Sequence, residues 1–147
     1  MTAGYSGTPL DRKLGIKPGF RVAFPDAPDD FPETLGALPD SVEIIASPFG
    51  TKTPPELDLV VLFTMARSDL VERFPVLAGK LNRNGMLWVA WPKKTSGVAT
   101  DLNENVVRDI GLSVGLVDTK VCAIDATWSG LKFVIRVKDR PRAKVKG

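Results

Sequence analysis

The most constraining feature of the sequence is a run of apolar residues at positions 59–63, which follows Asp58 without a polar interruption. Such a run suits a β-strand that is covered on both faces of its sheet. A second apolar run, at residues 86–91, follows a segment with helical spacing from Ser68 to Asn82. Because two buried strands joined by a helix form a β-α-β crossover, the sequence predicts a parallel strand pair at the centre of the fold.

The other segments fit around this central unit. Helices are predicted at residues 8–14 and 31–38 and after the capping-box pattern Asp101–Glu104, and strands at 20–24, 41–46, 116–124 and 131–137. The last two strands are joined by a link too short for a helix, so they must pair antiparallel. The predicted fold class is α/β: a Rossmann-like three-layer α/β/α arrangement, mostly parallel, with an antiparallel hairpin at its carboxyl-terminal edge.

The length of 147 residues suits one domain. We place this single domain at residues 1–137, with an amino-terminal loop and short helix at 1–19. Residues 138–147 hold five basic residues and one acidic residue, and are expected to be a disordered basic tail. The rest of the chain is close to neutral. A nucleic-acid groove binder needs a basic face on its folded body, so this charge distribution argues against nucleic acid as a partner.

The composition excludes several functions. The chain has no histidine, which removes the commonest general base and the commonest transition-metal ligand. Cys122 is the only cysteine, so there is no disulfide within the chain and no cysteine cluster for zinc. No apolar run approaches the roughly 20 residues that span a bilayer, and the first residues lack a signal-peptide pattern. We therefore expect a cytoplasmic protein with no membrane partner, and the sequence identifies no catalytic residue, no metal site and no particular cofactor.

Two resemblances add to this interpretation. Gly85–Val89 after a helix, a further helix–strand step, and Gly115–Asp118 entering a hairpin resemble the last half of the class I S-adenosylmethionine-dependent methyltransferases. The resemblance covers roughly residues 57–137. In that family a glycine-rich turn after the first strand and an acidic residue ending the second strand hold the cofactor. Here Pro25–Pro28 and Ala46–Ser47 stand at those positions, so no cofactor contact carries over to any residue.

The second resemblance concerns the whole chain. The strings Gly4–Leu10, Lys13–Gly19, Trp91–Lys94 and Trp128–Phe133 together resemble a bacterial, actinobacterial-type domain-of-unknown-function family. That resemblance implies no activity, cofactor or catalytic residue.

The loop at residues 91–97 is the most suggestive candidate for binding. It brings Lys93, Lys94 and Ser96 to the carboxyl end of a strand, just before a helix, where amines and hydroxyls suit a phosphate or carboxylate. Arg67 and Ser68, which follow the central strand, are expected to face the same crevice, and Ser68 is also a candidate helix N-cap. The alternative is a solvated turn around a core tryptophan, since lysines are exposed by default.

Two further candidates lie elsewhere. Asp26, in the turn after the first strand, can bind a hydroxyl-bearing ligand or a hard cation. Trp128 is either a hairpin residue that covers the sheet edge or a stacking platform for an aromatic ligand. Two hypotheses follow: a non-catalytic Rossmann-like domain that binds a small anionic metabolite or a protein partner, and a divergent methyltransferase-like transferase with a degenerate cofactor site.

Overall fold

A computed structural model describes residues 8–46, 48–49 and 56–140 of the chain. Tyr5 and most of the opening string, most of the loop at 47–55, and the tail from residue 141 therefore lie outside the described residues. The segment at the start of the tail is described. Val137–Asp139 form a 3-10 turn, η2, and the Arg140 Nε donates to the Ile135 carbonyl over 3.1 Å.

The amino-terminal half alternates short helices with strands. Its elements are α1 (Leu10–Leu14), β1 (Arg21–Ala23), α2 (Phe31–Leu35), β2 (Glu43–Ile44) and β3 (Leu57–Phe63). The carboxyl-terminal half contains α3 (Arg67–Ala78), β4 (Leu81–Pro92), the 3-10 turn η1 (Lys94–Ser96), α4 (Glu104–Val114), β5 (Leu116–Ala123) and β6 (Trp128–Ile135). In the described part of the chain, no helix is long and apolar enough to cross a bilayer.

The six strands of the described residues form one sheet in the order β2-β1-β3-β4-β6-β5. The pairs β1–β2, β1–β3 and β3–β4 are parallel, whereas β4–β6 and β5–β6 are antiparallel. This confirms the prediction of an α/β fold with a parallel centre and an antiparallel edge hairpin. The carboxyl ends of β1, β3 and β4 share one edge of the sheet, which is where ligands bind in open α/β folds.

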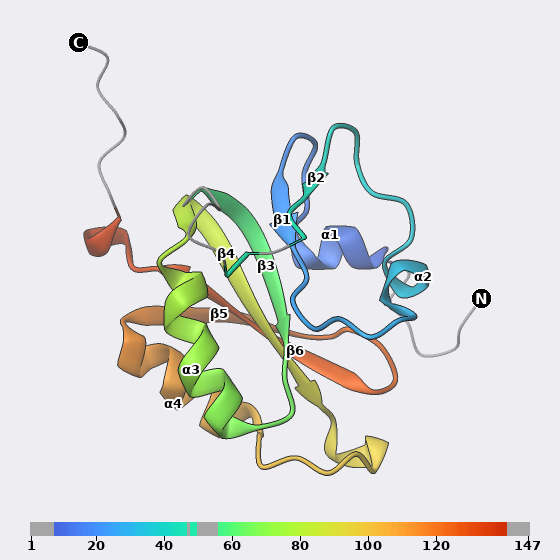
Figure 1. The fold of residues 1–147 in the computed structure, drawn as a ribbon, viewed down its shortest axis with the longest axis vertical. Coiled ribbons are helices and arrows are strands. Elements are labelled where there is room, and N and C mark those ends of the chain that lie inside the picture. Colours follow the sequence, from blue (N-terminus) through green and yellow to red (C-terminus); the bar gives the residue numbers. More distant parts are fainter. Residues whose placement is uncertain (1–7, 47, 50–55, 141–147) are drawn as a thin grey trace.

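The two faces of the sheet carry separate apolar cores. Along β3, Val60 and Leu62 point into the core beneath α3 and α4, while Leu59, Val61 and Phe63 point into the core beneath α1 and α2. This alternation follows from the period of two in a β-strand, and it explains why the apolar run lacks polar residues. Figure 1 shows α3 and α4 together against one face, with α1 and α2 lying beside β1.

Several element boundaries differ from the prediction. Strand β4 begins at Leu81 rather than Met86, so Asn82–Gly85, predicted to be a turn, lies within the strand. Asn82 Nδ2 donates to the Asp58 carboxylate, which also accepts the Arg21 backbone N–H over 2.7 Å. Asp58 thus holds β1 and β4 to β3 at their amino ends. Strand β2 has two residues instead of the six predicted, and both are exposed.

Candidate functional site

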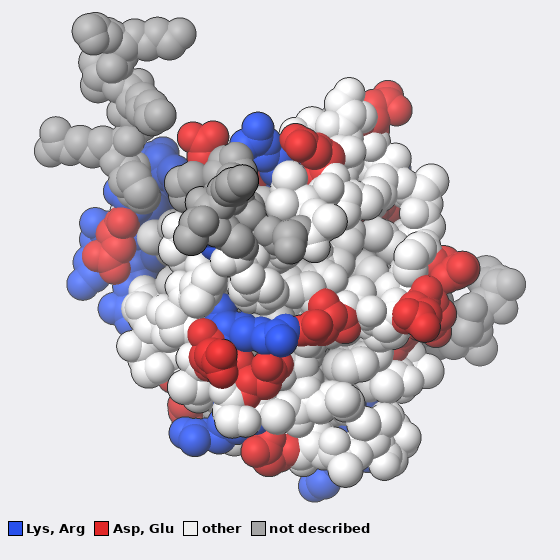
Figure 2. All heavy atoms as spheres, viewed as in Figure 1, with Lys and Arg blue, Asp and Glu red and all other residues white. Residues whose placement is uncertain are grey.

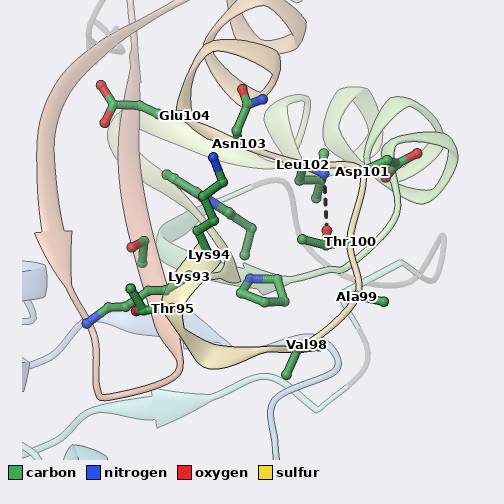
Figure 3. Close-up of a pocket in the computed structure, with 13 residues that line it drawn as sticks. Lys93, Lys94, Thr95, Val98, Ala99, Thr100, Asp101, Leu102, Asn103 and Glu104 are labelled. Atoms are coloured by element: carbon green, nitrogen blue, oxygen red, sulfur yellow. Dashed lines mark hydrogen bonds between the residues drawn. The ribbon is translucent and has the colours of Figure 1, made fainter.

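A pocket opens at the carboxyl end of β4, between the lysine loop and the start of α4. Its volume is about 700 Å³. Lys93, Lys94 and Thr95 lie along one wall, and the segment from Val98 to Glu104 curves around the other side. Figure 3 shows that Lys94 extends toward Asn103 and Glu104, whereas Lys93 extends in the opposite direction. The pocket therefore lies at the edge of the sheet where the sequence predicts ligand binding. Its lining residues are Trp91–Thr95, Val98–Glu104 and Ser129.

The lysine wall is held by its own backbone turn. Lys93 N–H donates to the Thr127 carbonyl over 2.7 Å, which ties the end of β4 to the start of the neighbouring strand. Ser96 Oγ donates to the Lys93 carbonyl over 2.6 Å and accepts the Val98 N–H over 3.2 Å. Gly97, with φ 78°, then reverses the chain in the left-handed region that glycine favours. Ser96 thus shapes the loop and is not among the lining residues.

The opposite wall is ordered by side chains that cap backbone groups. Asn103 is the N-cap of α4, and its Oδ1 accepts the Val106 N–H over 2.9 Å. The predicted capping box placed this role on Asp101, which was wrong by two positions. Thr100 Oγ1 donates to the Met65 carbonyl over 2.5 Å and accepts the Leu102 N–H over 3.1 Å, the bond drawn in Figure 3. Polar residues of this segment therefore fix the shape of the pocket.

Asp101 joins the pocket to α3. Its Oδ1 accepts the backbone N–H of Arg67 over 2.7 Å, so a carboxylate from another loop serves the first turn of α3. The N-cap residue of α3 is Ala66, which corrects the expectation that Ser68 would cap this helix. Arg67 and Ser68 are both exposed and are not among the lining residues. The sequence placed them correctly after the central strand, but the pocket is bounded by Asp101 instead.

The charges that line the pocket differ in how they are neutralised. Glu104 Oε2 pairs with the Arg108 guanidinium at 2.6 Å, and Asp101 accepts the helix N–H described above. The hydrogen bonds that the Arg108 guanidinium donates to Glu104 and then to Asp118 raise the pKa of Arg108 above its ordinary value. Among residues 8–46, 48–49 and 56–140, neither Lys93 nor Lys94 has an ion-pair or hydrogen-bond partner for its ammonium group. Within the part of the chain that the structure describes, the acids of the pocket are thus partnered, while its two amines are not.

Asp26 is engaged in a different cluster, at the carboxyl end of β1. Its carboxylate pairs with the Arg73 guanidinium of α3, which also lies 2.9 Å from Asp69 and 5.2 Å from the centre of the Phe49 ring. Asp26 itself has φ 60°, an uncommon conformation for a residue other than glycine. Over α3, Figure 2 shows basic and acidic side chains side by side rather than one continuous charged area. The turn after β1 is thus occupied by an internal ion pair.

Trp128 belongs to a third group of residues. It begins β6, where Asp125 Oδ1 accepts the N–H groups of Thr127 and Trp128, both over 2.8 Å. Its half-buried indole packs edge-on against Phe63, with ring centres 5.1 Å apart. Phe63 in turn contacts Phe31 of α2 over 4.9 Å. Trp128 therefore packs in the α1–α2 core. It pairs with Pro92, next to Lys93, but it is not among the residues that line the pocket.

Sequence reasoning missed the residues that form the second wall of the pocket. Asp101, Asn103 and Glu104 entered the prediction only as a helix-start signal and Thr100 did not enter it, although all four closely follow the lysine loop. Their closeness in sequence to Lys94 was the available signal. Arg73 was also missed, and its spacing of four residues from Asp69 on one helix was the clue to that pair. In the described residues, no group of three or more acidic or thiol side chains is arranged to hold a metal ion.

Comparison with solved structures finds the same architecture in other proteins. A possible exported protein from Bordetella parapertussis aligns with a TM-score of 0.62 at 12% identity, over 86% of this chain and 65% of that one. A SAM-dependent methyltransferase from Aquifex aeolicus aligns with a TM-score of 0.57 at 12% identity, over 83% of this chain and 85% of that one. The chain has a methyltransferase-like fold.

A further structure with this methyltransferase-like fold is the SAM-bound magnesium protoporphyrin IX methyltransferase from Synechocystis. It aligns with a TM-score of 0.55 at 12% identity, over 86% of this chain and 74% of that one. Identities this low establish the fold alone. No family model matches the chain, so the resemblance to a bacterial domain family stays a prediction, and no curated protein matches it either.

Proposed function

We propose that this chain is a non-catalytic binding domain with a methyltransferase-like fold, and that it binds a small anionic ligand in the pocket between Lys93, Lys94 and the start of α4. The observation that carries the proposal is the unequal neutralisation of the lining charges. Glu104 and Asp101 have partners in Arg108 and the Arg67 N–H, whereas the two ammonium groups have none in the described part of the chain. A phosphate or carboxylate supplies the missing partner through charge-assisted hydrogen bonds.

The placement of the pocket supports the same proposal. It lies at the carboxyl end of a parallel strand and beside the first turn of an eleven-residue helix, α4, whose dipole favours negative charge. The chain lacks the histidine that most acid–base mechanisms use. These features suit retention of an anion better than turnover of a substrate.

Replacing both pocket lysines tests the proposal. In the Lys93→Ala/Lys94→Ala variant, we expect the affinity for inorganic phosphate or a sugar phosphate to fall about tenfold or more, because each charge-assisted hydrogen bond contributes about 1.5–3 kcal/mol. The melting temperature should change little, because Lys94 is exposed, Lys93 is only half-buried and neither ammonium group has a partner in the described residues; surface side chains of this kind contribute within about 0.5 kcal/mol. Isothermal titration calorimetry measures the first quantity, and differential scanning fluorimetry the second.

The matched control is Lys17→Ala, which removes an exposed lysine from the turn before β1. This variant should bind like the unmodified chain at the same ionic strength. Equal loss of affinity in both variants would show that only net charge matters, and would contradict a site at the lysine loop. A large loss of stability in the Lys93/Lys94 variant would mark the loop as structural instead.

A divergent transferase is the second candidate, and the solved methyltransferases that share the fold favour it. Against it stands the turn after β1. By the family resemblance, a glycine-rich cofactor turn belongs there, but Pro25 and Asp26 occupy it and Asp26 is paired with Arg73. Calorimetry with S-adenosylmethionine separates the two candidates. Saturable micromolar binding that persists in the Lys93/Lys94 variant would support the transferase and contradict the non-catalytic binding domain.

A further inference from the structure

Two lysines face each other directly across the antiparallel edge hairpin. The register pairs Lys120 of β5 with Lys132 of β6, and the neighbouring pair joins Lys132 to Trp88 of β4. Because paired residues point to the same face, both lysines lie on the face of Trp88, which belongs to the α1–α2 core. Like charges placed opposite each other destabilise a strand pair. The stability of the sheet therefore does not explain why two lysines stand opposite each other here.

A third lysine reaches the same place from α1. Lys13 Nζ donates to the Ala123 carbonyl over 3.0 Å, and Lys120 Nζ lies 3.4 Å from the Lys13 carbonyl. These contacts hold the end of α1 against the end of β5. Within the described ranges, no carboxylate forms an ion pair with Lys13, Lys120 or Lys132. The Lys132 ammonium lies over the Trp88 ring at 6.0 Å, a distance at which the ring face attracts a cation.

The pKa of Cys122 is sensitive to the charge of this lysine cluster, which comprises Lys13, Lys120 and Lys132. The thiol lies two residues after Lys120 and packs partly against the same core. Burial, the largest effect, raises the pKa of Cys122, while the three lysines each act to lower it. Burial and then Lys120 lower the pKa of Lys132. Both side chains thus lie in a positive potential that no acid among the described residues offsets.

We propose that Lys13, Lys120 and Lys132 form a second anion site, which binds a small multivalent oxyanion of the phosphate or pyrophosphate class beside Cys122. The three lysines come from α1, β5 and β6 and lie near Cys122 at the edge hairpin, and lysine binds phosphate as a point charge. An anion there offsets the cross-strand repulsion between Lys120 and Lys132. This site lies on the α1 face of the sheet and is independent of the pocket beside β4.

The thiol provides a direct test, because Cys122 is the only cysteine in the chain. The experiment measures the rate at which iodoacetamide, an uncharged reagent, alkylates the full chain with and without pyrophosphate, at matched ionic strength. A bound anion counteracts the lysines, raises the thiol pKa further and reduces the reactive thiolate. We expect saturable slowing of about tenfold, the effect of a pKa change of one unit.

The variants make the outcome specific. Lys120→Gln/Lys132→Gln should abolish the effect of pyrophosphate when the variant is compared with itself in the absence of the anion. It removes a like-charge pair, so its melting temperature should not fall. Lys94→Gln, in the pocket beside β4, should keep the full effect. An alkylation rate that pyrophosphate leaves unchanged in the unmodified chain would overturn the proposal, as would equal slowing in the Lys120/Lys132 variant. Neither result bears on binding at Lys93 and Lys94.

Discussion

Gly111→Ala should lower the free energy of unfolding by about 1–3 kcal/mol, or more where the neighbouring ring is unable to move. Gly111 is buried in α4 against Phe133 of β6, and a Cβ atom added there would lie 2.6 Å from Phe133 Cδ2. Helix propensity alone predicts the opposite sign, because alanine is favoured over glycine in a helix by about 1 kcal/mol. The steric term should win, since Phe133 is fully buried and packs against Phe74 with ring centres 5.1 Å apart.

Gly79→Ala is the matched control for this prediction. Gly79 follows α3 with φ −70°, and the nearest atoms to an added Cβ lie at an ordinary contact distance of 3.6 Å. That variant should be neutral or more stable by about 0.4–1 kcal/mol. Urea denaturation of both variants gives the comparison. Equal stabilities would contradict the close packing of α4 on β6, whereas partial recovery in Gly111→Ala/Phe133→Leu would locate the clash at the ring.

Trp88→Ala should lower the free energy of unfolding further, by about 3–5 kcal/mol. Trp88 is fully buried at the centre of β4, and its indole N–H donates to the Leu14 carbonyl at the end of α1 over 2.9 Å. The residue thus combines core packing with the attachment of α1. Trp88→Phe keeps most of the apolar volume but leaves the Leu14 carbonyl without this donor, which should cost about 1–3 kcal/mol.

Trp128→Phe serves as the comparison, because Trp128 is only half-buried and packs edge-on at the border of the same core. It should cost clearly less than Trp88→Phe. The stabilities follow from thermal and urea denaturation, and hydrogen exchange at α1 reports its attachment. If Trp88→Phe left both stability and exchange at α1 unchanged, the hydrogen bond to Leu14 would have no role in holding that helix.

The central strands could be predicted because the hydrophobicity of their residues directly indicates burial on both faces of the sheet. Residues 59–63 alternate between two buried faces, so a continuous apolar run is the only pattern that fits. The start of β4 could not be predicted in the same way. Asn82 and Gly85 are typical turn residues, but Asn82 bonds to Asp58, and an added Cβ at Gly85 would lie 2.8 Å from the Leu57 carbonyl. Contacts with a neighbouring strand determine that this segment is a strand, and the local propensity of its residues carries no information on those contacts.

The candidate site was likewise predictable in part. Lys93 and Lys94 were predicted from their position at a strand end, and the structure places both at the pocket. Asp26 was expected to face a ligand, but its carboxylate forms an ion pair with Arg73, which lies 47 residues later in the chain. Which of several polar groups pairs with which is set by side-chain directions at the loop ends. Sequence spacing locates such groups on the correct edge of the sheet, but it does not choose their partners.

The position of Asp101 links two parts of the molecule that are distant in sequence. One carboxylate borders the pocket and also accepts the first amide of α3. A change in the position of this carboxylate therefore also changes how the first amide of α3 is satisfied, so one side chain ties the wall of the pocket to the start of a helix that lies 34 residues earlier in the chain.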